Sequence, residues 1–372
     1  MTLAEKLANV SWPFVIIVVL LAVVGYGMLY SAAGGEHSPW AWRHAMRFAV
    51  GAGAMLVVAL IDIRLWFRYA LLIYVVALIA LIGVEIMGEI GKGAQRWIDL
   101  GVIQLQPSEI MKIGLVLALA RLFHAAYLED VRSPFSLVLP ALLIIMPALL
   151  VLRQPDLGTT VMLVAGGGVL FFLAGVPLWL FALVIGAVGA ALPVAWEQLH
   201  DYQKQRVLTF LDPENDPLGS GYHIIQSKIA LGSGGTWGKG FVQGTQSQLN
   251  FLPEKHTDFI FTMLAEEAGF FGAVLVLILC MVIVVYGIFI ALRARAQFGR
   301  LLACGISVTF FLYVVINVAM VTGAIPVVGV PLPLVSYGGT AMLTVLVGFG
   351  LLLCVDVHRD VYIPRFPVDL PN

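Results

Sequence analysis

Two long apolar runs constrain the fold more than any other feature of this chain. Leu157–Trp196 contains no charged residue over 40 positions, and Leu301–Val355 contains none over 55. A helix of about 20 apolar residues spans a bilayer, so each run is long enough for two crossings. Charged residues make up only 12% of the 372 residues, against roughly 25% in a soluble domain. We therefore predict an all-α polytopic membrane protein and exclude a soluble enzyme, a nucleic-acid binder and a disordered chain.

The remaining apolar runs bring the predicted number of transmembrane helices to about ten. Turns at Gly175–Pro177 and Pro326–Pro333 divide the two long runs. The other predicted spans are Leu7–Gly35, Ala45–Ile61, Tyr69–Val84, Pro107–Arg121, Ser133–Leu152 and Ala268–Leu292. The first run is much longer than the apolar core of a signal peptide, so we predict an uncleaved helix. Residues 1–372 are predicted to form a single integral membrane domain.

One long loop, residues 197–257, separates the seventh and eighth predicted spans. Loops of this length usually carry function. Ten spans place both termini on one side, where ten basic residues of short loops and helix ends lie, against six on the other side. The positive-inside rule therefore favours cytoplasmic termini and an extracytoplasmic loop. Glycines are frequent in this loop, either as flexible structure or for close backbone approach to a ligand, and Tyr222–Leu231 is predicted to form a short interfacial helix.

Charged residues at the predicted membrane boundary are candidates for function because each is costly to insert. Glu109 and Lys112 are three positions apart and share one face of the fourth helix. They form either an ion pair between helices or part of a polar cavity. Arg43 and Arg47, at the outer end of the second helix, either extend to the interface or contact a substrate.

Cations from several outer loops suit a diphosphate, which arginine binds through two parallel hydrogen bonds. A solvated loop surface is the alternative for any one of them. Arg206, in the long loop, is the first choice for this role. The cations of these outer loops are Arg96, Arg153, Lys204, Arg206, Lys228, Lys239 and Lys255.

The segment Leu252–Phe261 (LPEKHTDFIF) has the most specific pattern in the chain. Asp258 lies where the long loop enters the eighth helix. Its carboxylate is placed either to accept a proton from a sugar hydroxyl as a general base or to cap the helix. The spacing supports the two roles equally. The three cysteines lie in apolar runs without metal-ligand spacing and are predicted to pack.

At these residues the chain resembles the SEDS family (shape, elongation, division and sporulation). Asn317–Ala341 is similar to the family's signature near the last helix. Three further motifs precede it in the expected order: Gln106–Glu109, Gln154–Thr159 and LPEKHTDFIF. These motifs extend over nearly the whole chain. Asp212–Gly235 is most similar to the family's elongation members.

The resemblance implies a peptidoglycan glycosyltransferase of the bacterial inner membrane that polymerises lipid II into β-1,4 glycan strands on the extracytoplasmic face. The family's aspartate falls on Asp258, as general base for the acceptor GlcNAc 4-hydroxyl, with undecaprenyl diphosphate as leaving group. No cofactor is required by the motifs, although a divalent cation (Mg²⁺ or Mn²⁺) is compatible with the chemistry. The implied substrate-binding residues are Arg43, Arg47, Arg96, Glu109, Lys112, Arg153, Asp156, Lys204, Arg206, Lys239, Glu254, Lys255 and His256.

The implied partners are a class B penicillin-binding protein with transpeptidase activity and other membrane proteins of the elongation complex, without nucleic acid. Three alternatives remain open at this point. A lipid II flippase would also carry charges and broken helices within the membrane. A division-type member of the same family and a scaffold for a partner synthase are the other two.

Overall fold

The computed structural model describes residues 2–87, 89–91, 94–99, 104–198, 204, 208–210, 212, 220–249, 251–252 and 254–365. Over these residues the chain is mostly helical, with one small antiparallel sheet in the order β1-β2-β3. The strands are β1 (Glu89–Gly91), β2 (Ala94–Asp99) and β3 (Gln104–Leu105). The helices are α1 (Leu3–Ala8), α2 (Trp12–Ala32), α3 (Ala41–Leu60), α4 (Ile63–Met87), α5 (Pro107–Ala125), α6 (Leu128–Arg132), α7 (Val138–Arg153), α8 (Leu157–Ala174), α9 (Leu178–Gln198), α11 (Ser220–Ser233), α12 (Thr245–Gln248), α13 (Ile260–Arg293), α14 (Gln297–Val321) and α15 (Gly339–Val357).

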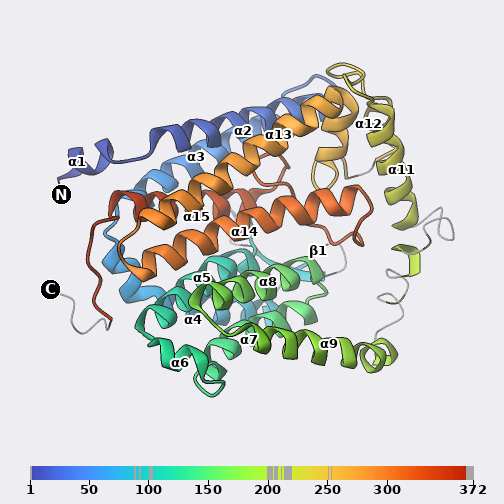
Figure 1. The fold of residues 1–372 in the computed structure, drawn as a ribbon. Helices are drawn as coiled ribbons and strands as arrows, with labels where there is room; N and C mark the ends of the chain where they lie inside the picture. Colours follow the sequence, from blue (N-terminus) through green and yellow to red (C-terminus); the bar gives the residue numbers. More distant parts are fainter. Residues whose placement is uncertain are drawn as a thin grey trace.

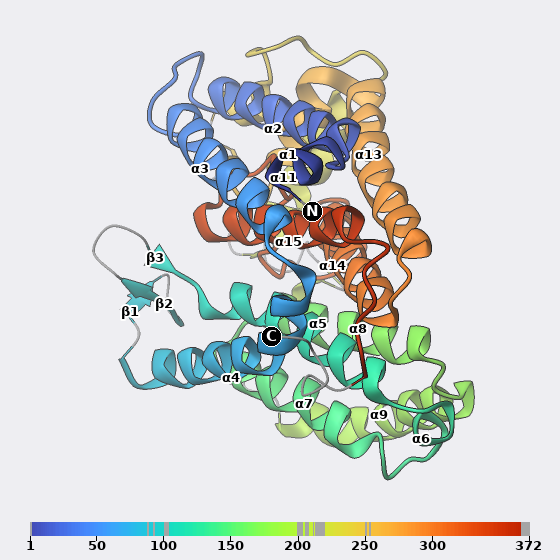
Figure 2. The same cartoon turned by 90° about the vertical axis from the view of Figure 1, so that its left-hand side faces the viewer.

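The long helices form a bundle with its most buried members in the middle. In Figures 1 and 2, α14 and α15 lie between one group of helices (α2, α3 and α13) and another (α4, α7, α8 and α9). Helix α5 packs against α4, α8 and α14, and most of its residues are buried. Its glutamate and lysine therefore lie inside the protein and not against lipid.

Seven helices within the described residues are long and apolar enough to cross a membrane: α2, α3, α4, α8, α13, α14 and α15. Helix α7 and the stretch Leu178–Ala191 of α9 are apolar but shorter. The protein is thus a multi-pass membrane protein, as its composition predicted. Each of the ten predicted segments contains a helix, whereas the number that cross remains a prediction.

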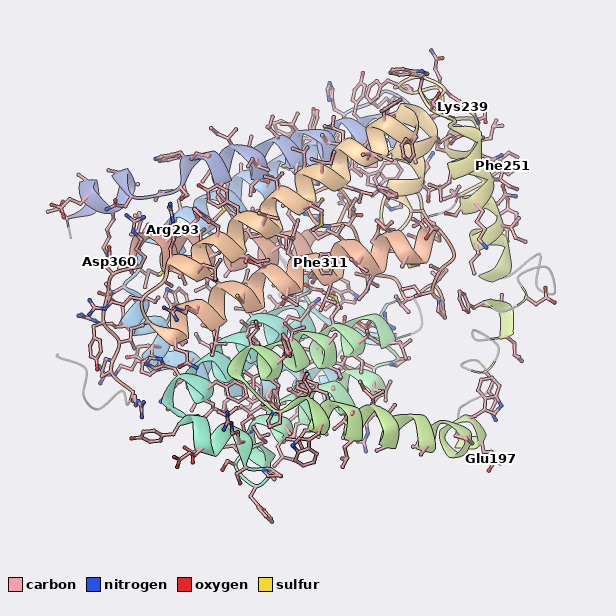
Figure 3. The ribbon with its side chains drawn as sticks, viewed as in Figure 1. Glu197, Lys239, Phe251, Arg293, Phe311 and Asp360 are labelled. Atoms are coloured by element: carbon pink, nitrogen blue, oxygen red, sulfur yellow. The ribbon has the colours of Figure 1, made fainter. Side chains whose placement is uncertain are left out.

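The two ends of the bundle differ in what they carry. Arg293 and Asp360 lie at one end, and Glu197, Lys239 and Phe251 lie at the opposite end (Figure 3). The α9–α13 connection with α11 and α12 is therefore at the far end of the bundle from Arg293 (Figure 1).

The predicted turns agree with the structure, whereas several helix ends differ by a few residues; α4, for example, begins at Ile63 and not at Tyr69. Gly175 ends α8 with φ 96°, and α11 contains the predicted short helix Tyr222–Leu231. The predicted span from Ala268 matches the part of α13 that follows a break at Gly269. The helix also has a part before this break, from Ile260, in which Glu266 and Glu267 are buried with hydrogen-bond partners. The sheet between α4 and α5 was not predicted, since its strands are only two to six residues long.

The glycine-rich part of the long loop packs closely against a break in α13. Gly269 interrupts the helix with φ 68° and ψ −168°, a conformation open essentially to glycine alone. The Lys239 amide donates to the Glu266 carbonyl at 3.0 Å, and the Phe270 amide donates to the Gly235 carbonyl at 2.9 Å. These glycines therefore allow close approach of the loop to the chain's own backbone.

Replacing Gly269 by alanine is expected to lower the melting temperature of the detergent-solubilised protein. The positive φ costs about 1–3 kcal/mol for a residue with a Cβ, and this Cβ would lie 2.3 Å from the Gly238 amide nitrogen. Gly53→Ala is the matched control, because a Cβ there meets nothing within 4 Å and alanine favours the helix. Equal melting temperatures for the two variants would contradict this account of the break.

Candidate active site

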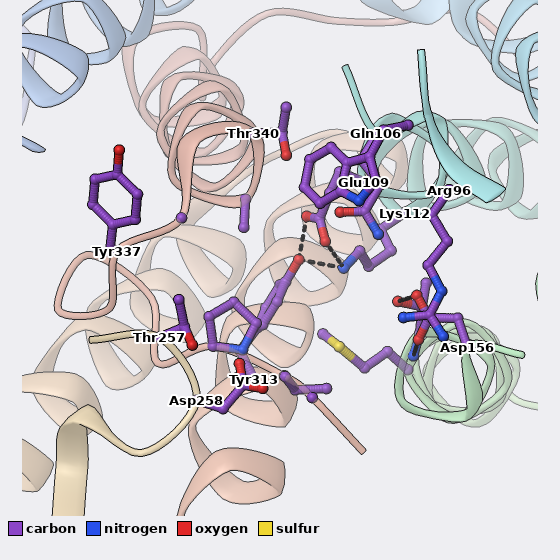
Figure 4. A pocket seen from close by; sticks show the side chains of 18 of the residues that line it. Arg96, Gln106, Glu109, Lys112, Asp156, Thr257, Asp258, Tyr313, Tyr337 and Thr340 are labelled. Atoms are coloured by element: carbon purple, nitrogen blue, oxygen red, sulfur yellow. Dashed lines mark hydrogen bonds and ion pairs between the residues drawn. The ribbon is translucent and has the colours of Figure 1, made fainter. Parts of the chain in front are cut away.

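A cavity of about 490 Å³ opens between α5, α8, α14 and the loop that leads into α13 (Figure 4). Residues from β2, from β3 and from the α14–α15 connection complete its wall. The cavity brings together five of the predicted site residues, which are Arg96, Glu109, Lys112, Asp156 and Asp258.

Glu109 and Lys112 form a buried ion pair that also lines the cavity. Lys112 Nζ lies 2.7 Å from Glu109 Oε1. From α14, the Tyr313 hydroxyl donates to Glu109 Oε2 and accepts from Lys112 Nζ. All three residues are at most 4% exposed. Both interpretations left open by the spacing hold, since the pair joins α5 to α14 and lies at the cavity wall.

Asp258 lies in the tight turn just before α13, and its side chain lines the cavity. The N-cap of α13 is Phe259 and not Asp258, and Phe259 makes no side-chain cap bond. Asn317 Nδ2 donates to the Asp258 carbonyl at 2.9 Å and to the Val330 carbonyl at 2.8 Å. Asn317 therefore connects the turn to the α14–α15 connection.

Arg96 and Asp156 organise the corner between α7 and α8 at the other side of the cavity. Arg96 Nε donates to the Gln154 carbonyl at 3.0 Å, and its Nη2 donates to the Pro155 carbonyl. Asp156 is the N-cap of α8 and accepts from the Thr159 amide and hydroxyl, each at 3.0 Å. Both residues thus support the cavity wall as well as lining it.

Two further predicted residues, Arg47 and His256, contact Tyr337, which lines the cavity. The Arg47 guanidinium lies over the ring of Tyr337, a cavity residue, at 4.8 Å from its centroid. His256 stacks on Trp40 at 4.4 Å between ring centroids, and its carbonyl accepts from the Tyr337 amide at 2.8 Å.

Three of the predicted cations lie on other surfaces. Arg43 borders a separate shallow pocket with Tyr26 and His37. Arg153 is largely exposed, with its guanidinium 3.8 Å from Glu85. Lys204 donates to a backbone carbonyl at Glu197. Arg206 lies outside the described residues.

The remaining predicted residues, Lys239, Lys255 and Glu254, bind other groups of the protein near α12 and the turn before α13. Lys239 Nζ lies 2.8 Å from the buried Glu266 carboxylate, and Lys255 Nζ donates to the Ser247 carbonyl at 2.7 Å. Burial lowers the pKa of the Lys255 ammonium, and the nearby Glu267 carboxylate partly offsets this. Glu254 Oε2 accepts from the Thr257 hydroxyl at 2.9 Å.

Carboxylates near the cavity do not form a metal-binding cluster within the described ranges. Glu109 binds Lys112 and Tyr313, and Asp156 binds Thr159. These carboxylates do not fit a protein-only cage for a divalent cation, so no step proposed below depends on one.

Tyr313 and Asn317 were not predicted as site residues. Both lie four positions apart in α14, within an otherwise apolar run. A polar side chain inside a transmembrane run is the sequence signal that indicates them.

Comparisons with known proteins agree with this arrangement. Residues 11–361 match the family of FtsW, RodA and SpoVE, described as cell cycle proteins. Peptidoglycan glycosyltransferase MrdB of Escherichia coli (strain K12) is 45% identical over 93% of this chain and 94% of its own. The probable peptidoglycan glycosyltransferase FtsW of Aliivibrio salmonicida is 36% identical over 90% of this chain and 84% of its own.

Two solved structures share the fold. A chain from a peptidoglycan synthase complex, studied for the coordination of polymerization and crosslinking, superposes with TM-score 0.82 at 33% identity, covering 94% of this chain and 98% of its own. The crystal structure of Thermus thermophilus rod shape determining protein RodA gives TM-score 0.71 at 28% identity, covering 94% and 97%.

Fold and cavity thus define a multi-pass membrane enzyme with charged groups collected at one buried site. The chain belongs to the SEDS family. It is a peptidoglycan glycosyltransferase, with greater identity to MrdB than to the division-type FtsW relative.

Proposed function

We propose that the cavity binds lipid II and that Asp258 is the general base of glycan polymerisation. The observation that carries this proposal is that Asp258 lines the same cavity as the buried Glu109–Lys112–Tyr313 group. A carboxylate at a cavity that also holds cationic groups suits a reaction that removes a proton and releases an anion.

The proposed reaction is a single displacement. The Asp258 carboxylate accepts the proton of the acceptor GlcNAc 4-hydroxyl while its oxygen attacks C1 of the donor sugar. The bond between C1 and the diphosphate oxygen breaks, and undecaprenyl diphosphate leaves with the electron pair. An α-linked donor becomes a β-1,4 linkage, so the reaction inverts and needs no covalent intermediate. Lys112 and Arg96 are the cavity cations proposed to face the diphosphate.

The proposed setting is the bacterial inner membrane with cytoplasmic termini and the cavity open to the extracytoplasmic side. The bias of basic residues toward the termini's side supports this orientation. A class B penicillin-binding protein is the proposed partner, alongside other elongation proteins. Its support is the similarity to a chain from a synthase complex that coordinates polymerization and crosslinking.

Purified full-length protein in detergent, supplied with lipid II with and without a class B partner, tests this function. We expect glycan strands on a gel, with a faster rate when the partner is present. A chain that moves lipid II across liposomes and yields no polymer under either condition would instead be a flippase.

A further inference from the structure

Two adjacent carboxylates in α13 are buried and take no part in the cavity. Glu266 is 0% exposed and Glu267 is 3% exposed. An ionisable group inside a membrane helix is costly and usually functional. The Glu267 carboxylate accepts from the Ser31 hydroxyl of α2 at 2.6 Å and from the Val242 amide at 3.2 Å. Glu267 therefore ties α2 to the long loop.

Glu266 holds the short helix α12 in place. Its Oε1 accepts from the Gln246 amide at 2.8 Å, and its Oε2 accepts from the Ser247 amide at 3.2 Å. These are first-turn amides of α12, which no carbonyl within that helix satisfies. Lys239 Nζ, 2.8 Å from Oε1, balances the charge. The carboxylate thus determines where α12 lies.

Helix α12 in turn holds the segment that carries Asp258. The Ser247 carbonyl accepts from Lys255 Nζ at 2.7 Å, and Lys255 is only 7% exposed. Lys255 lies three positions before Asp258 in a tight turn, where the Thr257 amide donates to the Glu254 carbonyl at 3.1 Å. Asn317 holds the other side of this turn through the Asp258 carbonyl. The turn is therefore fixed from two directions.

We propose that Lys255 and Glu266 are positioning residues for Asp258, acting through α12 and not through contact with substrate. This inference rests on the proposed function, because it assumes that the position of the Asp258 carboxylate limits the rate. Lys255, predicted from its charge to bind substrate, becomes an internal support. The side chain's burial and its bond to the Ser247 carbonyl carry the assignment.

The test compares steady-state kinetics of full-length Lys255→Met and Glu266→Gln with the wild type, using lipid II as substrate. We expect kcat to fall by about tenfold or more, since misplacing a reacting group by about 1 Å costs up to about 10²-fold. KM should stay within about twofold, because no contact with bound substrate is removed. Glu129→Gln, an exposed glutamate of α6, is the control and should keep wild-type kinetics.

Lys255→Gln guards against a variant that does not fold, because it buries a neutral polar side chain that retains an N–H donor but is one bond too short to reproduce the contact with the Ser247 carbonyl. If Lys255→Met is unfolded, Lys255→Gln decides the matter by the same fall in kcat at constant KM. A rise in KM at unchanged kcat would overturn the proposal and make Lys255 a substrate contact. Unchanged kcat in Lys255→Gln and Glu266→Gln, beside an inactive Asp258→Asn, would overturn the inference alone. An active Asp258→Asn would instead overturn the proposed function.

Discussion

Replacing Asp258 by asparagine is expected to slow lipid II polymerisation by about 10²–10⁴-fold, the usual contribution of a general base. The amide has nearly the same shape, so the turn before α13 is retained. The bonds that hold this turn use the backbone carbonyls of Thr257 and Asp258, which the substitution leaves in place. The amide cannot accept the acceptor's proton. The initial rate of glycan formation, compared with the melting temperature, measures the effect.

Asp360→Asn is the matched control for this substitution. The Asp360 side chain is 91% exposed at the opposite end of the bundle from Lys239. It should keep both wild-type activity and wild-type stability. Asp258→Asn at close to the wild-type rate would show that Asp258 is structural and would remove the proposed mechanism.

Lys112→Ala is expected to destabilise the protein by about 3–5 kcal/mol, because it leaves Glu109 buried without its cation. The double variant Lys112→Met with Glu109→Gln should recover most of that stability, since it buries no charge and keeps an acceptor for the Tyr313 hydroxyl. The recovered protein should remain about 10²–10³-fold less active, as expected when a preorganised charge at the reacting centre is lost. Thermal unfolding in detergent and initial polymerisation rates measure the two effects.

Arg359→Ala provides the comparison for stability, because its ion pair with Asp360 is exposed at 3.7 Å. Exposed ion pairs contribute little to stability, so this variant should have the melting temperature of the wild type. A double variant that regains activity together with stability would mean that Glu109 and Lys112 only join α5 to α14.

The helices could be predicted largely because the length of an apolar run determines whether it can span a bilayer. Hydropathy could not predict the part of α13 before its break at Gly269, since charge was taken to end the span, whereas Glu266 is compensated there by Lys239 and by amides of α12. Those partners come from about 20 to 27 positions earlier in the chain. Only tertiary packing brings these residues together, so the spacing of residues in the sequence does not predict the contact.

In the site, too, contacts between residues close in the sequence could be predicted, whereas contacts between distant residues could not. The pairing of Glu109 with Lys112 follows from helical spacing and is confirmed at 2.7 Å. Tyr313, which completes the group, comes from 201 positions beyond Lys112. Charge and predicted membrane side grouped Lys255 with Arg96, but neither property indicates which way a side chain points. The structure turns Lys255 toward α12 and brings Arg96 to the cavity.

Lipid II binding and turnover, measured on the same preparation of Asp258→Asn, test the central claim most directly. A base that acts on bound acceptor contributes to the reaction and little to affinity. We predict a dissociation constant for lipid II close to that of the wild type, together with glycan formation that is about 10²–10⁴-fold slower. Two results would contradict the assignment of Asp258 as the base. One is polymerisation at the wild-type rate, and the other is loss of lipid II binding in a variant with the wild-type melting temperature.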